Sequence, residues 1–197
     1  SLMKQSLCAC GDPKCQSYVC GEIKSLSISE SIRKRPAMHG IDPADPTSLL
    51  LTVTKMMIEV SKIKPEDIEI RFRKNFDYLG QSVDVCLMVW KEIWTNDHQM
   101  ELDLVSPKNY QEWHWPMLTA LCPQVSVFCQ SDSGSYCKIL FRNFQLKIRE
   151  LVNTVHGSLV KNKPFTAIYL TLDPEFFTSL KFENLERLPV KINHLDK

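Results

Sequence analysis

The chain has little glycine, no long apolar run and almost no net charge. Six glycines occur among 197 residues, and the formal net charge is +1. A domain held to nucleic acid through phosphates usually carries a clear basic excess, so any basic surface here has to be local. The longest aliphatic stretch, residues 49–60, contains Lys55 and Glu59 and is too short to span a bilayer. The composition therefore predicts a globular chain with a sizeable core and no membrane partner.

Familiar catalytic motifs are also missing from the sequence. There is no P-loop, no glycine-rich dinucleotide turn, no H-E-x-x-H and no G-x-S-x-G. Several residues have the chemistry of a nucleophile or a base, but none lies in a recognisable signature: Cys86, Cys122, Cys129, Cys137, His98, His114 and His156. We therefore predict no catalytic residue, and the sequence favours a chain that is not an enzyme.

Cysteine, by contrast, is abundant, and half of it is concentrated at the start of the chain. Four of the eight cysteines fall within thirteen residues in the spacing C-x-C-x4-C-x4-C, namely Cys8, Cys10, Cys15 and Cys20. Four thiolates suit the tetrahedral coordination of Zn²⁺, and a segment with so few apolar residues needs a metal to fold. We predict one structural zinc ion here. A framework of disulfides is the alternative, but a chain of this size does not need one.

The cysteine spacing resembles two known zinc-binding families. It matches the tesmin-type CXC module as far as Cys20, where Glu22 stands in place of the next cysteine. Cys8, Cys10, Gly11 and Cys15 also resemble the post-SET tail of histone methyltransferases, although that tail follows a catalytic domain and here it opens the chain. Both resemblances imply zinc binding and cover about a tenth of the chain.

Hydrophobic periodicity predicts an α+β fold, a mostly antiparallel sheet with helices packed on one face. The segment 83–94 is apolar throughout and fits either a strand pair or a buried helix. Helices are expected at residues 47–60, 110–121, 144–159 and from 173 onward, and strands at 68–72, 100–104, 125–129, 136–141 and 167–172. We expect three parts: a zinc-binding segment 1–28, a connector 29–46 and an α+β interaction domain 47–197.

Two clusters are candidates for partner binding. The basic run of Arg33, Lys34 and Arg35 is typical of a phosphate contact or a nuclear import signal, with a solvated linker as the ordinary alternative. Trp113 and Trp115 flank His114, and tryptophan is enriched in interaction hot spots, although core packing is the commoner role.

These features together predict a zinc-stabilised, non-catalytic protein-interaction domain of a larger intracellular assembly, with a nuclear location favoured over a cytoplasmic one. A protein partner fits the near-zero charge best. One alternative is a chromatin- or nucleic-acid-binding module that uses the zinc segment and the basic run. The other is a thiol- or metal-dependent enzyme with an unfamiliar signature.

Overall fold

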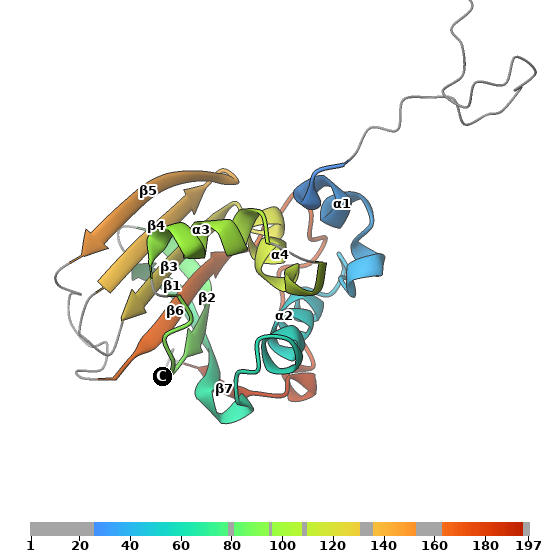
Figure 1. The fold of residues 1–197 in the computed structure, drawn as a ribbon. Coiled ribbons are helices and arrows are strands. Elements are labelled where there is room, and N and C mark those ends of the chain that lie inside the picture. Colours follow the sequence, from blue (N-terminus) through green and yellow to red (C-terminus); the bar gives the residue numbers. More distant parts are fainter. Residues whose placement is uncertain are drawn as a thin grey trace, which may run out of the picture.

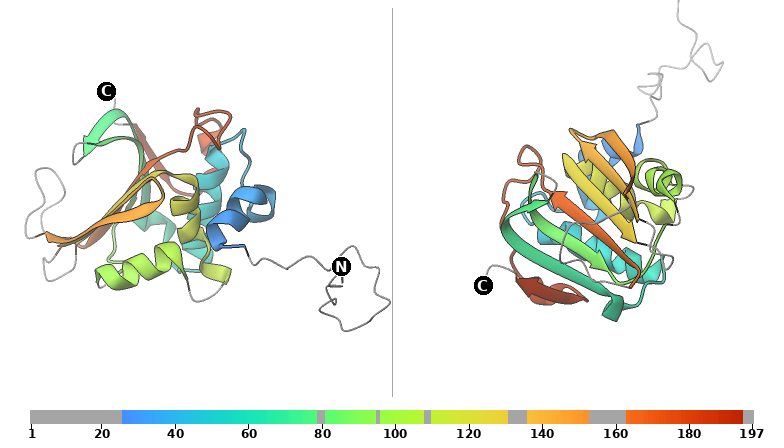
Figure 2. Two further views of the ribbon diagram at one scale, coloured as in Figure 1. Left: turned by 90° about the horizontal axis from the view of Figure 1, so that it is seen from above. Right: turned by 90° about the vertical axis from the view of Figure 1, so that its left-hand side faces the viewer.

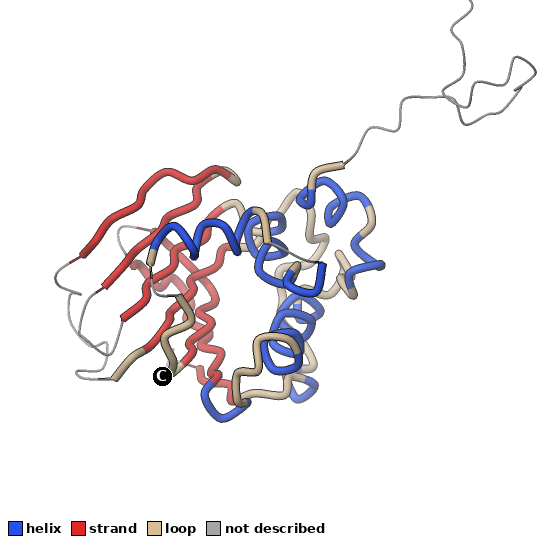
Figure 3. Tube along the Cα trace, viewed as in Figure 1, coloured by secondary structure: helices blue, strands red, loops and turns tan. Residues whose placement is uncertain are grey.

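The protein is described by a computed structural model that covers residues 26–78, 81–94, 96–107, 110–130, 136–152 and 163–194. Within these ranges the chain forms two layers, a seven-stranded sheet and four α-helices (Figure 1). The helices all lie on one side of the sheet (Figure 3). The predicted α+β class is therefore confirmed. No helix in the described ranges is both long enough and apolar enough to cross a membrane.

The sheet is twisted and has the strand order β5-β4-β3-β6-β2-β1-β7 (Figure 2). Neighbouring strands run antiparallel, except that β7 lies parallel to β1 at one edge. The strands are β1 (Ile68–Tyr78), β2 (Gln81–Val89), β3 (Gln124–Gln130), β4 (Tyr136–Arg142), β5 (Gln145–Val152), β6 (Phe165–Thr171) and β7 (Lys191–His194). Consecutive strands pair in the hairpin β1–β2 and in the meander β3–β4–β5, and β6 lies between these two groups.

Four α-helices form the second layer. Their buried side chains meet the inward-facing residues of the sheet in one large apolar core. They are α1 (Ile28–Lys34), α2 (Thr47–Glu59), α3 (Asp97–Val105) and α4 (His114–Leu121). The helix predicted over 47–60 is confirmed as α2. Pro116 falls in the first turn of α4, where its missing N–H leaves no hydrogen bond unmade.

The opposite face of the sheet carries a second, smaller apolar cluster. It is formed by the alternate residues of the central strands β2, β3 and β6, and Trp90 packs against it. Its members are Cys86, Met88, Phe128, Phe165, Ala167 and Tyr169. The central strands are thus apolar on both faces, which explains why residues 83–89 showed no clear period in the sequence.

Three predicted elements are wrong. Residues 100–104 were expected as a strand but lie in α3, because Met100 and Leu104 are one helical turn apart and both are fully buried. Asn96 starts this helix by accepting a hydrogen bond from the Gln99 N–H at 2.8 Å. Leu102, which suggested alternation, is 39% exposed on the outer face of the helix.

The helix expected over 144–159 is also wrong where the structure describes it, because residues 145–152 form β5. Asn143 and Phe144 have φ angles of 51° and 62°, and this backbone shape makes a tight hairpin turn between β4 and β5. The helix expected from residue 173 is wrong as well, since the chain there only turns before continuing without regular structure.

The segment 29–46, expected as a connector, contains α1 and a short 3-10 helix, Pro36–His39. Ser27 and Glu30 form a capping box at the start of α1, and Ile32 is fully buried in the core. The domain boundaries predicted at 28 and 46 stay predictions.

Candidate functional site

The three residues of the predicted basic run differ in their contacts and exposure. Arg33 is engaged within the molecule: its Nη1 atom lies 2.8 Å from Asp173 Oδ2 and donates to the Ala120 carbonyl at 3.0 Å. Lys34 and Arg35, in contrast, are exposed. The three basic side chains therefore do not form one recognition patch, and a partner-binding role for the run stays a prediction.

Arg33 is also enclosed by aromatic rings. Its guanidinium carbon lies 5.2 Å from the ring centroid of Phe144 and 5.4 Å from that of Phe176. A guanidinium stacked on rings in this way is stabilised by the ring quadrupole. Arg33 thus joins α1, the β4–β5 turn and the start of the C-terminal segment, which we define as residues 172–194.

The predicted aromatic pair is divided in a similar way. Trp115 is 3% exposed and packs edge-on against Trp94, with ring centroids 5.1 Å apart. Trp113 is half-buried and stacks on His39 at 5.5 Å. Trp115 is therefore a core residue in this structure, and a partner-binding role for the pair stays a prediction.

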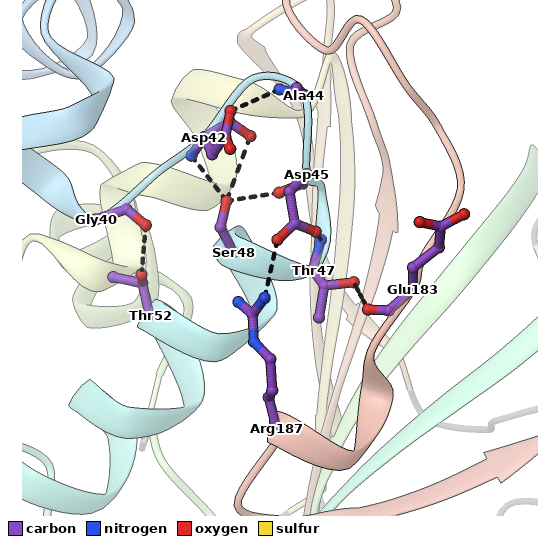
Figure 4. A network of polar contacts seen from close by, with 9 residues as sticks. All are labelled: Gly40, Asp42, Ala44, Asp45, Thr47, Ser48, Thr52, Glu183 and Arg187. Carbon is purple, nitrogen blue, oxygen red and sulfur yellow. Dashed lines mark hydrogen bonds and ion pairs between the residues drawn. The ribbon is translucent and has the colours of Figure 1, made fainter.

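A polar network surrounds the N-terminus of α2 (Figure 4). Asp45 Oδ1 accepts a hydrogen bond from the Thr47 N–H at 3.1 Å, and the Ser48 hydroxyl donates to the Asp45 carbonyl at 2.6 Å. The Asp42 N–H donates to Ser48 Oγ at 2.8 Å. Arg187 pairs with Asp45 at 3.2 Å. The chain itself therefore occupies this helix terminus, which would otherwise attract an anion.

The same network joins segments that are far apart in sequence. Thr47 Oγ1 donates to the Glu183 carbonyl at 2.7 Å, and the Thr178 N–H donates to the Pro43 carbonyl at 2.9 Å. Gly40, at φ 75°, allows the chain to turn closely over Thr52, whose hydroxyl donates to its carbonyl at 3.2 Å. These contacts hold the C-terminal segment against α2.

His114 and Ser61 form a buried pair between α4 and the end of α2. Ser61 Oγ lies 3.1 Å from His114 Nε2, while Nδ1 makes no hydrogen bond. Burial lowers the pKa of His114 to about 4, and the backbone of Gln111 opposes this shift only in part. A serine beside a neutral histidine is the start of a nucleophilic pair, but here no acid orients the ring and the histidine is fully buried. The pair is suited to packing rather than to catalysis.

Glu69 forms a charged cluster on the helix-free face of the sheet. The residue is 6% exposed, and its carboxylate accepts hydrogen bonds from Arg71 at 3.0 Å and from the Asn193 amide at 2.9 Å. Burial acts to raise the pKa of Glu69, but the hydrogen bonds from Arg71 and Asn193 outweigh it and the pKa is lowered. The cluster joins β1 to β7, and its donors leave the carboxylate well satisfied.

Three of the described cysteines, Cys86, Cys122 and Cys129, are buried. Burial raises the pKa of Cys86 to about 12 and also raises the pKa of Cys122. A protonated, buried thiol is a poor nucleophile, so neither residue is activated for catalysis.

The four cysteines predicted to bind zinc, Cys8, Cys10, Cys15 and Cys20, lie outside the described residues. In the part of the chain that the structure describes, no group of three or more His, Cys, Asp or Glu side chains is placed to hold a metal ion.

Sequence reasoning missed Asp173 and Glu69, the two carboxylates around which buried polar contacts are organised. In the sequence, Asp173 stood only at the start of an expected helix, and Glu69 only within an expected strand. Trp90 and Asn193 both donate hydrogen bonds to Glu69, but only the strand order shows that these two residues lie beside it. No local pattern links Arg33 to a residue 140 positions later in the chain.

Comparisons with known proteins identify the class of fold. No protein-family model matches the chain, and no curated protein matches it by sequence. Among solved structures, the chain is similar to the B-subunit of the DNA gyrase from Myxococcus xanthus, at 14% identity with a TM-score of 0.58. The similarity covers 86% of this chain and 53% of that one, so the chain spans about half the length of this neighbour.

Two further structures have the same fold. One is the topoisomerase IV ATP-binding domain of Francisella tularensis, solved with a small-molecule inhibitor, at 16% identity and a TM-score of 0.59, covering 87% of this chain and 91% of that domain. The other is the 43K ATPase domain of Thermus thermophilus gyrase B, solved with an aminocoumarin, at 16% identity and a TM-score of 0.56, covering 82% and 43%. The structure resembles the GHKL ATPase fold.

This likeness corrects the functional prediction from the sequence. The neighbours named above are an ATPase domain, an ATP-binding domain and a gyrase subunit, rather than zinc-stabilised interaction domains. The prediction of a non-catalytic zinc domain, and of Zn²⁺ as its cofactor, is therefore wrong: the fold belongs to a different class, and the described residues offer no metal-binding group. The neighbours lend no support to the nuclear assignment, which stays a prediction.

Proposed function

We propose that this chain is a nucleotide-binding module that binds ATP. The single observation that supports the proposal is the fold, since a two-layer arrangement covering 82–87% of the chain matches two domains described as ATP-binding or ATPase. Motif searches do not detect a nucleotide site here, because the chain lacks a P-loop and a glycine-rich turn.

The proposal is limited to binding. Mg²⁺ usually accompanies ATP and needs an octahedral set of oxygen ligands. Three buried or half-buried carboxylates of the described residues already have cationic partners: Asp173 pairs with Arg33, Glu69 with Arg71, and Asp45 with Arg187. Within the described ranges no cluster of ligands is available. These residues do not fit a magnesium site, so no hydrolytic step is derived for the chain.

We also propose that the chain works with a protein or nucleic-acid partner. Support comes from the neighbours, which are a DNA gyrase subunit and domains of gyrase B and topoisomerase IV. The exposed Lys34 and Arg35 are the described part of the basic run that remains accessible to such a partner.

Calorimetric titration with ATP, ADP and GTP tests the nucleotide proposal. Each ligand is titrated once with Mg²⁺ and once with EDTA, and inorganic triphosphate serves as a control for simple charge attraction. We expect saturable binding of ATP that exceeds the binding of triphosphate and survives EDTA. If no nucleotide binds while circular dichroism shows folded protein, the proposal is wrong.

A further inference from the structure

Two cysteines lie directly opposite each other on neighbouring strands. In the antiparallel pair β3–β4, the residue facing Cys129 is Cys137. Directly opposed residues of such a pair have Cα atoms about 4.5 or 5.5 Å apart, depending on their hydrogen bonding. Both separations fall within the range of about 4.4–6.8 Å that a disulfide requires. The Cα spacing at this position is therefore compatible with a disulfide.

The register places both positions on the helix-covered face of the sheet. Cys129 is 2% exposed, and its Sγ atom lies 3.3 Å from Oγ1 of Thr166, the residue that faces it on β6. On β4, Ile139 and Phe141 belong to the same core cluster as Cys129. Because alternate residues of a strand share a face, position 137 lies on the face of 139 and 141. The burial on β3 and on β4 therefore places both positions, 129 and 137, on the helix-covered face.

The other described cysteines have no such neighbour. Cys86 on β2 faces Arg71 on β1 and Tyr169 on β6. Cys122 follows α4 and precedes β3, outside any strand. Among the described strands, the juxtaposition is specific to Cys129 and Cys137, and the remaining two cysteines provide internal controls.

We propose that Cys129 and Cys137 form a reversible disulfide when the chain meets a low-molecular-weight disulfide such as oxidised glutathione. Because Cys129 is 2% exposed, the reaction takes place when the β3–β4 pair opens locally, and one cysteine thiolate then attacks a sulfur of the oxidant and releases one glutathione thiolate. The second cysteine thiolate then attacks the mixed disulfide, closes the protein bond and releases the second glutathione. The two protons lost by the cysteines are taken up by the two glutathione thiolates, so two protein thiols are oxidised as one oxidant disulfide is reduced.

Oxidation changes the contacts of the segment that joins β2 to α3. In the reduced chain, the Cys129 thiol donates to the Trp94 carbonyl at 3.4 Å. Thr166 Oγ1, beside it, donates to the Lys91 carbonyl at 3.0 Å and accepts from the Ile93 N–H at 3.3 Å. A disulfide removes the S–H donor at Trp94 and draws the sulfur toward β4. The segment 91–94 is then held by fewer hydrogen bonds, which links the redox state to the entry into α3.

The test is carried out on the full chain incubated with oxidised or with reduced glutathione. Peptides are mapped by mass spectrometry without reduction, and amide exchange is followed across residues 91–94. We expect a linked peptide pair joining Cys129 to Cys137, a loss of two thiols in these strands, and faster exchange at Ile93. Dithiothreitol should reverse all three changes.

Variants separate this bond from other oxidation of the chain. Cys122→Ser should retain the linked pair, whereas Cys129→Ser should lose it together with the change in exchange. Cys137→Ser gives the same test should Cys129→Ser fail to fold. Mapping assigns any bond among the first four cysteines to its own peptides. Glutathione adducts without a 129–137 link, or unchanged thiols at these positions, would overturn the proposal.

Discussion

Two ion pairs attach the C-terminal segment to the helical layer, and they differ in their exposure to water. Arg33 and Asp173 are 2.8 Å apart, with side chains 32% and 6% exposed. Arg187 and Asp45 are 3.2 Å apart, with side chains 42% and 26% exposed. Water and salt screen both partners of the second pair, while in the first pair the Asp173 carboxylate is buried and only Arg33 is partly exposed. Two ion pairs with similar distances can therefore contribute different free energies to the stability of the fold.

Replacing Arg33 is expected to change stability most, and it tests the difference between the two ion pairs directly. Arg33→Met keeps a long apolar side chain but leaves Asp173 buried without its cation, and the Ala120 carbonyl loses a donor. Leaving a buried carboxylate without its cation is strongly destabilising, so we expect a loss of about 3 kcal/mol in the free energy of unfolding. Urea denaturation followed by circular dichroism measures this loss.

Lys34→Met is the matched control, because it removes a neighbouring positive charge from the exposed face of α1. We expect this variant to unfold within about 0.5 kcal/mol of the parent chain. Equal losses in the two variants would show that net charge, rather than the buried contact, is responsible.

His114 extends the comparison to a buried polar group that has no charged partner. Its pKa in the folded chain is lowered to about 4, below the ordinary value of 6.5. The folded state therefore disfavours the protonated ring, so this contribution to stability is fully present above pH 6.5 and is lost as the pH falls toward 4. We expect a loss of about 2 kcal/mol between pH 7 and pH 5, measured by urea denaturation at each pH.

His114→Gln removes the titrating ring and keeps a polar side chain within reach of Ser61. This variant should show a flatter dependence of stability on pH between 7 and 5. An unchanged slope would mean that another group causes the loss.

Phe144 tests how far the aromatic surroundings strengthen the inner pair. Phe144→Leu keeps an apolar side chain at the same backbone position but removes the ring from Arg33. We expect a loss of about 0.5–1 kcal/mol, the usual size of such a contact at a partly exposed site. Phe144→Leu should lower the free energy of unfolding less in the Arg33→Met background than in the parent chain. If the two losses simply add in this double-mutant cycle, the proposed contact is contradicted.

The outer pair should contribute least. Arg187→Ala removes an exposed side chain, and Asp45 keeps its hydrogen bond to the Thr47 N–H. We expect a change of less than about 0.5 kcal/mol in the free energy of unfolding, decreasing further at high salt. A loss as large as that of Arg33→Met would show that exposure does not distinguish the two pairs.

The sequence predicts the fold class and several elements for clear physical reasons. The spacing of Leu49, Leu50, Val53 and Met57 identifies α2 because these residues face the core on one side of the helix. The alternation of Ile68, Ile70 and Phe72 identifies β1 for the same reason. A helix or strand whose apolar residues all face one core can be predicted from the spacing of those residues in the sequence.

Other elements depend on contacts that no local pattern contains. β5 resembled an amphipathic helix, and only its pairing with β4 across the Asn143–Phe144 turn makes it a strand. The sequence shows Arg33 only as part of a basic run, and only the fold shows that Asp173 lies beside it. The fold class of the neighbours could not be anticipated either, because at 14–16% identity the shared arrangement leaves little trace in the sequence.

The parallel pairing of β7 with β1 has a consequence for how the chain matures. Asn193 bonds Glu69 across 124 positions, so this edge of the sheet closes only after nearly all described residues have been synthesised. Pairings between such distant segments form slowly, because a long stretch must be ordered before any contact rewards it. Until β7 pairs, the outer edge of β1 has unpaired backbone groups, so the pairing of β7 protects this edge from pairing with another chain.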